Sequence, residues 1–381
     1  MIYNTVKIRQ RPERTGDPTH GTSKGQAVMS LGGGTAHDLP RPGRGPGARP
    51  RTLLAMDRRT FDLQCAPAVL DHLQNSAELG EPLRDGAFED PGARARLAGC
   101  EVLLTSWGCP PITEDVLADA PRLRAVLHGA GSVRGHVPPA LLDRGIRVTT
   151  SAAADAVPVA EYTPAMLLAC GKRVPFLVHD ARAFRSRWSY TSARGPLSNR
   201  GRTVCLIGWS RVGRLLGRLL APFDLEVLVL APCADAEQVA ACGARLTTAQ
   251  DTYPRTDVLS LHAPLLPTTR RMIDAAALAQ LSDGATVINT ARGGLVDTAA
   301  LERECRTGRL YAVLDVTGPE PLPDDSVLYD CENVVITPHI AGSPDSETER
   351  MAIAALDELD RFRTGQPAEH PITPDTYEVT A

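Results

Sequence analysis

From residue 51 onward, short apolar runs rich in β-branched residues alternate with segments of helical periodicity. Ten runs are predicted to be strands, at 51–56, 101–105, 124–128, 146–149, 203–207, 226–230, 257–261, 286–290, 312–316 and 334–337. Parallel strands need long crossover connections, and a helix between consecutive strands is the usual one. The alternation therefore predicts an α/β fold built on parallel sheets. Aromatic residues are only 4% of the chain, which fits aliphatic cores between helices and sheets.

The helical segments divide this alternation into two parts. Helices are predicted at 66–73, 113–120, 138–143, 154–173, 211–220, 268–281, 298–307 and 344–364, and 176–199 is interpreted as helix and loop. The long helix at 154–173 carries the chain out of the first group of strands, and the amphipathic helix at 344–364 is expected to return to it. We therefore predict one domain from 51–155 plus 343–381, and a second domain from 156–342.

The first 50 residues differ in composition from the rest. They contain nine Gly, six Pro, eight Lys and Arg, and three Asp and Glu. Such a segment buries too little apolar surface to offset the entropy of ordering it. We expect 1–50 to be a disordered N-terminal extension.

Bulk properties argue against several classes of function. The net charge of −4 does not fit a nucleic-acid-binding surface, and no apolar run approaches the roughly 20 residues of a membrane span. No apolar secretory signal is visible at the N-terminus. The nine cysteines are scattered without a CxxC pair, which favours reduced thiols in a cytoplasmic protein and no metal site.

A glycine-rich turn follows the run at 203–207 and opens the helix at 211–220. It reads Gly208-Trp-Ser210-Arg211-Val212-Gly213. The dinucleotide-binding fingerprint is Gly-x-Gly-x-x-Gly, so Ser210 replaces the glycine that lets the backbone approach a pyrophosphate. The serine adds a Cβ but supplies a hydroxyl donor. The turn at the head of six predicted strands favours a dinucleotide site.

The next strand ends without the acidic residue that usually binds the adenosine ribose of NAD. Ala231 occupies that position, and Asp235 would substitute only if the loop folded back. No arginine follows directly to bind the 2′-phosphate of NADP. The sequence leans toward NAD and leaves NADP possible.

Three consecutive predicted strands are each followed by a chemically useful side chain. Arg292 follows 286–290, Glu320 follows 312–316 and His339 follows 334–337. Parallel strands end at the same edge, where open α/β sheets bind ligands. In isolation, each side chain would be interpreted as a solvated, loop or structural residue. Their shared placement predicts a catalytic group.

Two loops of the first domain are expected at the carboxyl edge of its sheet. One contains Trp107, and the other comprises Gly129, Ala130, Gly131 and Ser132, followed by Arg134. Glycines there would let backbone N–H groups approach an anion, although two ordinary turns would have the same composition.

Taken together, the motifs resemble the D-isomer-specific 2-hydroxyacid dehydrogenases, a family that includes phosphoglycerate dehydrogenase. The resemblance covers about 51–370 and rests on 156–173 (Val-Ala-Glu, then Leu-Ala-x-x-x-Arg), 208–213, His262-Ala-Pro264-Leu with Thr269, Asn289-Thr-Ala-Arg292-Gly, Leu314-Asp-Val with Glu320-Pro-Leu-Pro, and Thr337-Pro-His339-Ile-Ala-Gly. It implies a doubly wound NAD(P)-binding domain, a smaller flavodoxin-like substrate domain, and a cleft between these two Rossmann-like domains.

The resemblance also implies roles for individual residues. Arg292 would bind the carboxylate and carbonyl oxygens of a 2-oxo acid, His339 would be the acid–base, and Glu320 its carboxylate partner. Further cofactor-binding positions would be Gly208, Ser210, Arg211, Val212, Gly213, His262, Pro264, Thr269, Thr290, Ala291, Asp315, Ala341 and Gly342. Substrate-binding positions would be Trp107, Gly129, Ala130, Gly131, Ser132 and Arg134. The implied assembly is a homodimer formed through the nucleotide domain.

The chemistry is consistent with these residue types. A guanidinium holds carboxylate and carbonyl oxygens bidentately, and a histidine titrates near neutral pH. Arg134 stands where the family often has an acidic or amide residue. With Trp107, it suggests a more anionic substrate.

Two rival functions remain open at this stage. One is a phosphite dehydrogenase-type enzyme; a formate dehydrogenase is disfavoured because those enzymes pair their histidine with glutamine. The other is an NAD(H)-sensing, corepressor-like binding protein with the same fold.

Overall fold

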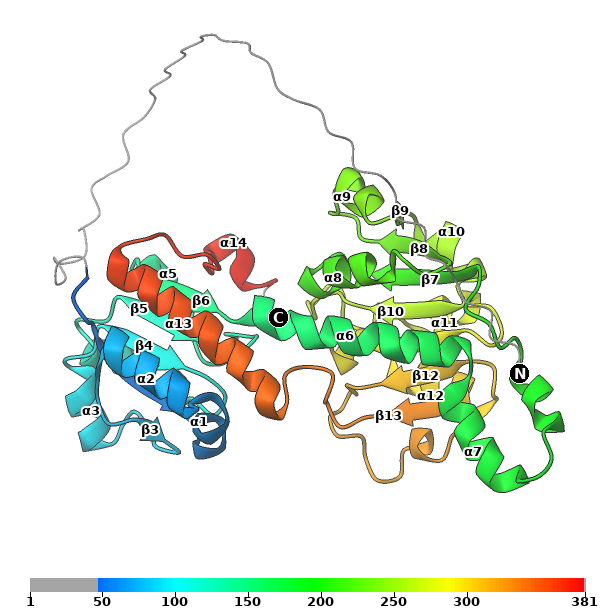
Figure 1. Ribbon diagram of the computed structural model, residues 1–381, viewed down its shortest axis with the longest axis horizontal. Coiled ribbons are helices and arrows are strands. Elements are labelled where there is room, and N and C mark those ends of the chain that lie inside the picture. Colours follow the sequence, from blue (N-terminus) through cyan, green and yellow to red (C-terminus); the bar gives the residue numbers. More distant parts are fainter. Residues whose placement is uncertain (1–46, 380–381) are drawn as a thin grey trace, which may run out of the picture. The chain divides into compact units, whose positions relative to one another are not determined.

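The computed structural model describes residues 47–379 (Figure 1). The predicted disorder of 1–50 therefore falls almost entirely outside the described residues. Within the described part of the chain, no helix is long and apolar enough to cross a membrane.

The first sheet is parallel and has the order β2-β1-β4-β5-β6, with β3 also paired to β1. Its strands are β1 (Arg51–Met56), β2 (Glu78–Leu79), β3 (Leu83–Arg84), β4 (Val102–Thr105), β5 (Ala125–His128) and β6 (Arg147–Thr150). The helices between them are α1 (Arg58–Gln64), α2 (Pro67–Ser76), α3 (Pro91–Leu97), α4 (Glu114–Asp119) and α5 (Ala140–Asp143). Leaving β3 aside, this is the flavodoxin-like 2-1-3-4-5 order.

The second sheet is also parallel, with the order β13-β12-β11-β10-β7-β8-β9. Its strands are β7 (Arg202–Ile207), β8 (Leu225–Leu230), β9 (Arg245–Leu246), β10 (Val258–Leu261), β11 (Thr286–Asn289), β12 (Tyr311–Leu314) and β13 (Val334–Ile336). The connecting helices are α8 (Arg211–Leu220), α9 (Ala236–Ala241), α10 (Ala249–Thr252), α11 (Ala275–Gln280) and α12 (Thr298–Arg306). Read from β9, with β7 counted as the first strand of this sheet, the order is 3-2-1-4-5-6-7. Its first six strands have the order found in dinucleotide-binding domains.

Four further helices lie outside these two series (Figure 1). They are α6 (Ala152–Gly171), α7 (Val174–Phe184), α13 (Thr348–Thr364) and α14 (Pro374–Tyr377). Helix α6 packs against α8, whereas α13 places Leu356 and Leu359 in the core beside Leu54 and Leu127 of the first sheet. The return of the last long helix to the first sheet was predicted from the sequence, while the proposed domain boundaries stay a prediction.

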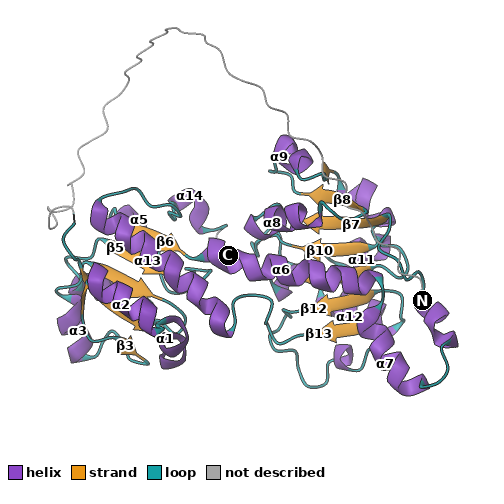
Figure 2. Ribbon diagram, viewed as in Figure 1, coloured by secondary structure: helices purple, strands orange, loops and turns teal. Residues whose placement is uncertain are grey.

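Helices pack over the sheets (Figure 2). Clusters of buried apolar side chains cover both faces of each sheet. In β10, for example, Leu259 and Leu261 face one core cluster and Val258 faces the other. Successive side chains of a strand point to opposite faces, so a doubly covered strand is apolar throughout. The predicted α/β fold with two doubly wound parallel sheets is confirmed.

Local differences from the predicted elements are small and have physical causes. The two-residue strands β2, β3 and β9 are too short to show a periodic pattern. Five short helices, α1, α3, α9, α10 and α14, were not predicted. Helix α11 is shorter than the predicted 268–281 because Leu266 to Thr269 form a turn held by the Thr269 side chain. The segment 176–199 contains most of α7, followed by the short 3₁₀ helix η1 (Ser189–Arg194). The other 3₁₀ turns are η2 (Tyr253–Arg255), η3 (Gly293–Leu295), η4 (Val327–Tyr329) and η5 (Asp345–Glu347).

Candidate active site

The glycine-rich turn lies where the strand order of the second sheet reverses. It follows β7, and the neighbouring strand β10 leads into His262 and Ala263. Gly208 has φ +97°, and a Cβ on it would lie 2.7 Å from the Ala263 backbone nitrogen. Only glycine fits this left-handed, tightly packed turn. Ligands of open α/β sheets bind where the strand order reverses. The glycine-rich turn therefore lies at the position where a ligand is expected.

The turn ends in the N-terminus of α8. Ser210 is the N-cap, and its Oγ accepts a hydrogen bond from the Gly213 N–H at 3.4 Å. The serine at the second fingerprint position thus starts the helix, whose first N–H groups and dipole favour an anion. Burial lowers the pKa of the Arg211 guanidinium, with a smaller contribution from Arg214. The turn therefore offers the positive potential that a pyrophosphate needs.

A pocket of about 140 Å³ extends from this turn to Arg292. It brings together predicted residues from both sheets: Gly131, Ser210, Arg211, Val212, His262, Pro264, Thr290, Ala291 and Arg292. The same pocket is also lined by Ala152, Asp155, Ala156, Val159, Ala263 and Val379, which the sequence did not single out. The remaining predicted residues lie outside this lining.

His262 and Thr269 have different surroundings. Burial lowers the His262 pKa to about 3, so the ring is neutral near pH 7 and one of its nitrogens pairs with Ser260 Oγ at 2.9 Å. Thr269 Oγ1 donates to the Pro264 carbonyl at 2.6 Å and accepts from the Leu266 N–H at 2.8 Å. Thr269 therefore shapes the loop that carries Pro264, and it does not line the pocket.

The end of β8 is the part of the nucleotide site that departs most from the fingerprint. Ala231 follows the strand, and its carbonyl accepts from the Ala234 N–H at 3.0 Å. The Asp235 carboxylate caps α9 by accepting from the N–H groups of Glu237 and Gln238, at 2.8 and 3.2 Å. The Oδ1 atom of Asp235 is thus used by the helix cap, and a contact of Asp235 with the ribose stays a prediction.

Arg292 leaves a tightly held turn after β11. The Asn289 side chain spans the turn, accepting from the Ala291 N–H at 3.1 Å and donating to the Arg292 carbonyl at 2.9 Å. A Cβ on Gly293 would lie 1.8 Å from the Thr317 carbonyl oxygen, so the loop after β12 can pack on this turn only because residue 293 is glycine. Burial lowers the pKa of the Arg292 guanidinium, and charges from Asp155, Arg134 and Glu320 also act on it. Of these charged groups, Asp155 lines the same pocket as Arg292.

His339 and Glu320 form a direct pair. The distance from His339 Nδ1 to Glu320 Oε1 is 2.6 Å, and the two side chains are about half exposed. The pairing occupies Nδ1 and leaves the imidazole Nε2 as the other proton-carrying position. The structure therefore brings together the histidine and carboxylate that the sequence placed after neighbouring strands, whereas their roles stay a prediction.

The buried carboxylate of Asp315 holds the backbone around His339. Its Oδ1 accepts from Thr337 Oγ1 at 2.7 Å and the Ile340 N–H at 2.8 Å, and its Oδ2 accepts from the Ala341 N–H at 2.9 Å. Asp315 is 2% exposed, so these charge-assisted bonds are shielded from water. Asp315 thus positions the histidine loop, whether or not it also contacts a cofactor.

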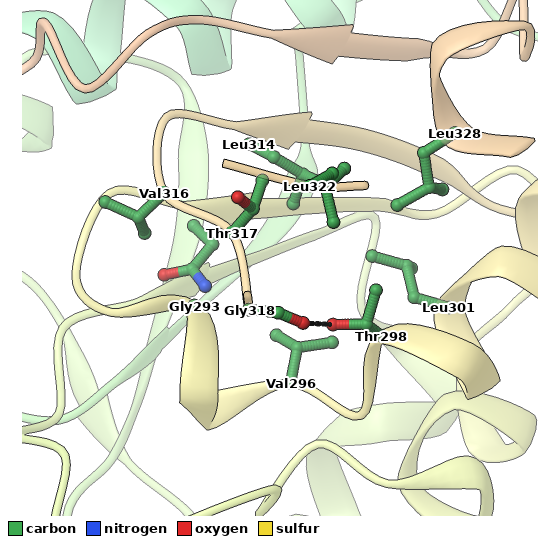
Figure 3. Close-up of a pocket in the computed structure, with 11 residues that line it drawn as sticks. Gly293, Val296, Thr298, Leu301, Leu314, Val316, Thr317, Gly318, Leu322 and Leu328 are labelled. Atoms are coloured by element: carbon green, nitrogen blue, oxygen red, sulfur yellow. Dashed lines mark hydrogen bonds between the residues drawn. The ribbon is translucent and has the colours of Figure 1, made fainter. Parts of the chain in front are cut away.

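A small apolar cavity is lined by Thr317 and Gly318 of the loop after β12 (Figure 3). Leu301, Leu314, Leu322 and Leu328 surround it, and Thr298 Oγ1 donates to the Gly318 carbonyl at 2.6 Å. This bond fastens the loop to the start of α12. The cavity volume is about 10 Å³, roughly the space of one water molecule, so it is not a substrate pocket.

The loop after β5 is fastened through its carbonyl groups. Thr150 Oγ1 donates to the carbonyls of Ala130 and Gly131 at 2.7 and 2.6 Å, and the Gly129 carbonyl accepts from Ser106 Oγ at 3.0 Å. These contacts orient the predicted anion-binding loop.

The other predicted substrate residues surround that loop. Ser132 Oγ accepts from the Arg134 N–H at 3.3 Å, and Arg134 Nη1 donates to the Leu265 carbonyl at 3.3 Å. Trp107 is 38% exposed on the loop after β4. Gly342 adjoins the pocket at Asp155, whose Oδ1 accepts from the Ser343 N–H at 3.2 Å.

Within the described residues, one group of side chains has metal-like spacing: His179, Asp180 and Glu332. Arg194 already bonds both carboxylates, reaching Asp180 at 2.7 and 2.5 Å and Glu332 at 3.2 Å. The guanidinium supplies the positive charge there, so this group fastens η1 to its neighbours.

Sequence reasoning missed Asp155, which lines the pocket from the first turn of α6. Its position directly after β6, at the carboxyl edge of the first sheet, was the available signal. Tyr162 was also missed; its hydroxyl pairs with Thr337 Oγ1 at 2.9 Å. Val379 reaches the pocket from the far end of the chain, and no local pattern announces such a contact.

The strand order, the fingerprint turn and the pocket define a dinucleotide-binding α/β protein. Residues 165–341 match the sequence model of the D-isomer specific 2-hydroxyacid dehydrogenase, NAD binding domain. Over 271 residues the chain is 30% identical to glyoxylate reductase of Aeropyrum pernix. The aligned region covers 70% of this chain and 81% of that protein. The chain belongs to the D-isomer specific 2-hydroxyacid dehydrogenase family, and its second sheet forms the NAD-binding domain.

Two further comparisons extend this result. D-3-phosphoglycerate dehydrogenase of Mycobacterium tuberculosis is 33% identical over 254 residues, covering 64% of this chain and 47% of that protein. The chain thus spans about half the length of the phosphoglycerate dehydrogenases that it matches. The crystal structure of the TT0316 protein from Thermus thermophilus superposes with a TM-score of 0.66 at 30% identity, covering 85% of this chain and all of that one.

Proposed function

We propose that the protein is an NAD-dependent dehydrogenase that interconverts a 2-oxo acid and the corresponding D-2-hydroxy acid. The observation that carries this proposal is the His339–Glu320 pair at 2.6 Å, on the same sheet edge as the partly buried Arg292. The residues around the fingerprint turn fit the cofactor, because the left-handed Gly208, the α8 N-terminus and Arg211 form a cradle for a pyrophosphate.

Each residue has a role that follows from its chemistry. The cofactor, when bound, supplies or accepts a hydride. Arg292 binds the carboxylate and carbonyl oxygens of the 2-oxo acid, since a planar guanidinium can hold two oxygens at once. His339 donates a proton from Nε2 to the carbonyl oxygen during reduction and removes it in the reverse direction. Glu320 orients the ring through Nδ1, and Asp315 fixes the backbone on either side of it.

The preference for NAD over NADP is a separate proposal. Selection of NAD normally uses a carboxylate on the ribose hydroxyls, whereas NADP needs a positively charged partner for its 2′-phosphate. Residues 231–235 contain no arginine or lysine, and the Asp235 carboxylate caps α9. We expect NADH to bind more tightly than NADPH, by a modest factor because the usual acid is absent. Titration of the protein fluorescence with each cofactor measures that factor, and tighter NADPH binding would contradict the proposal.

A second anionic group on the substrate is favoured by Arg134. The positive charge of Arg134 contributes to the lowered pKa of Arg292, and on this proposal each guanidinium binds one group of a dianionic 2-oxo acid. Trp107, on the loop after β4, is expected to contact the substrate as well. Gly129 to Ser132 would present backbone groups to the substrate carboxylate.

We also propose a homodimer formed through the NAD-binding domain. Helix α7 and the following turn expose four apolar side chains, Val174, Val178, Phe184 and Trp188, and Trp188 is 75% exposed. Exposed apolar clusters of this kind mark interaction surfaces. Light scattering after gel filtration would give a dimer for the wild type, and a shift toward monomer for Val178→Asp but not for the similarly exposed Ile353→Asp.

The enzyme proposal is tested by NADH oxidation, followed at 340 nm with a panel of mono- and dianionic 2-oxo acids. Steady consumption with at least one of them supports a dehydrogenase. Tight NADH binding without turnover of any member would support the sensing, corepressor-like alternative, and oxidation of phosphite with NAD would support the phosphite dehydrogenase-type alternative. The nine free cysteines fit the expected cytoplasmic location, which cell fractionation would test.

A further inference from the structure

The segment after α13 returns to the first sheet and is anchored there. The Ile372 N–H donates to the Val148 carbonyl at 2.8 Å, Pro371 forms an antiparallel bridge with Thr149, and the Ile372 side chain is 5% exposed in the core. Helix α14 then begins with a capping box between Thr373 and Thr376. Residues 371–377 are therefore held by main-chain bonds, core burial and a helix cap.

Tyr377 connects this segment to the predicted substrate loop. Its hydroxyl donates to the Val137 carbonyl at 2.6 Å, and its ring packs against the apolar core of the first sheet. Burial raises the pKa of the hydroxyl, with smaller effects of Glu378 and Arg134, so the group is protonated near neutral pH and can donate this bond. Val137 lies three residues after Arg134, and Tyr377 therefore holds the end of the loop that carries that arginine.

Val379 extends the segment into the pocket. Its N–H donates to the Thr376 carbonyl at 3.2 Å, so it continues the turn of α14. Its side chain lines the same pocket as Gly131, Asp155 and Arg292, and it is 50% exposed. An apolar side chain thus lines a pocket whose charged lining residues are Asp155, Arg211 and Arg292.

We propose that the C-terminal segment 371–379 is a wall of the substrate site, in which Tyr377 positions the substrate loop and Val379 limits the length of the ligand. This inference rests on the proposed function, since it takes the ligand of this pocket to be a 2-oxo acid. The class of ligand that this wall favours is a short-chain 2-oxo acid, because Val379 lines the pocket together with Gly131 and Arg292 and an apolar branched side chain there restricts its size.

The positioning role of Tyr377 is tested with Tyr377→Phe. Loss of one hydrogen bond, worth about 0.5–1.5 kcal/mol, should raise the KM for the 2-oxo acid roughly 2- to 10-fold. The kcat, the Kd for NADH and the melting temperature should stay close to wild type. Tyr190→Phe is the matched control, because Tyr190 lies on η1 and stacks on Phe184. A kcat loss without a KM change, or equal effects of both variants, would overturn the role.

The wall is tested with two substitutions of opposite expected effect. Val379→Gly should raise the ratio of kcat/KM for 2-oxohexanoate over pyruvate about 10-fold, in the range that one or two methylene groups are worth in a pocket. Val379→Phe should lower the same ratio. Unchanged ratios in both variants, or changes of the same sign, would contradict the proposal that Val379 limits the length of the ligand.

A failure of the proposed function gives a different result. If the wild type reduces no 2-oxo acid, hydrogen exchange of the amides of residues 129–137 and binding of pyruvate and 2-oxohexanoate to the NADH-loaded protein replace the kinetics. Two results would support the role of segment 371–379 independently of catalysis. The amides of residues 129–137 would exchange faster in Tyr377→Phe than in Tyr190→Phe, and the binding preference of Val379→Gly would shift toward 2-oxohexanoate. Equal exchange and equal binding would refute it.

Discussion

His339 Nδ1 and Glu320 Oε1 are 2.6 Å apart, and this pair joins the loops after two neighbouring strands, β12 and β13. The histidine has φ +55°, a left-handed conformation that non-glycine residues adopt infrequently. Asp315 holds it there through the side chain of Thr337 and the N–H groups of residues 340 and 341. The loop is thus built to hold the imidazole in one orientation.

Glu320→Gln tests that orientation. The amide keeps the size of the side chain but removes the charge, so we expect kcat/KM to fall roughly 10- to 100-fold, the worth of a hydrogen bond to a charged group. Binding of NADH should not change. Asp360→Asn is the matched control, since Asp360 pairs with His72 at 2.7 Å on the first domain. Equal activity in both variants would show that Glu320 has no role in the reaction.

Arg292→Lys tests the carboxylate clamp. Lysine keeps the charge but loses the planar, two-pronged geometry, so the KM for the 2-oxo acid should rise at least about 10-fold while NADH still binds. Arg218→Lys, on the exposed side of α8, should leave the kinetics unchanged. Steady-state kinetics with saturating NADH measure both, and a wild-type KM in Arg292→Lys would contradict the clamp.

Arg134→Ala tests the preference for a dianionic substrate. Removing the second guanidinium should lower kcat/KM for dianionic 2-oxo acids more than for monoanionic ones, by roughly 10-fold in their ratio. Competition between one acid of each kind gives that ratio directly. An unchanged ranking of the two classes would refute a substrate role for Arg134.

Two buried histidines make the stability depend on pH. Burial lowers the pKa values of His128 and His262 from 6.5 to about 3, so the unfolded chain binds two protons that the native protein does not. Their stabilising effect is complete above pH 6.5 and is lost as the pH falls toward 3. We expect the free energy of unfolding to drop by about 2 kcal/mol between pH 7 and pH 5.5.

Urea denaturation at these two pH values measures the effect. His262→Asn should reduce the pH dependence by about half, because one of the two buried rings is then absent. A free energy of unfolding that is constant over this interval would contradict the assignment of both rings as neutral.

Much of the fold was predictable because the strands that build the second sheet are apolar on both faces. Runs such as 203–207 and 286–290 have no polar alternation, and the following Gly208 and Arg292 mark where each strand ends. The fingerprint turn and the three candidate catalytic residues could therefore be placed on the same sheet edge. The order of the strands in the sheet then showed which of these residues follow neighbouring strands.

What could not be predicted depends on contacts between distant parts of the chain. The Tyr377 hydroxyl meets the Val137 carbonyl across 240 residues, and Val379 enters the pocket from beyond the last long helix. The Oδ1 atom of Asp235 caps the first turn of α9, while its contact with a ribose stays a prediction. Thr269 holds the loop that carries Pro264, while its contact with the cofactor stays a prediction. Neither outcome can be read from spacing alone.

The most direct test of the account is the effect of His339→Gln on NADH oxidation by a 2-oxo acid. Loss of the acid–base should lower kcat by about 10²- to 10⁴-fold while the Kd for NADH stays unchanged. His72→Gln is the matched control, because His72 also pairs with a carboxylate and is similarly exposed. A His339→Gln protein that turns over as fast as the wild type, or no greater loss than in His72→Gln, would contradict the proposed catalytic site.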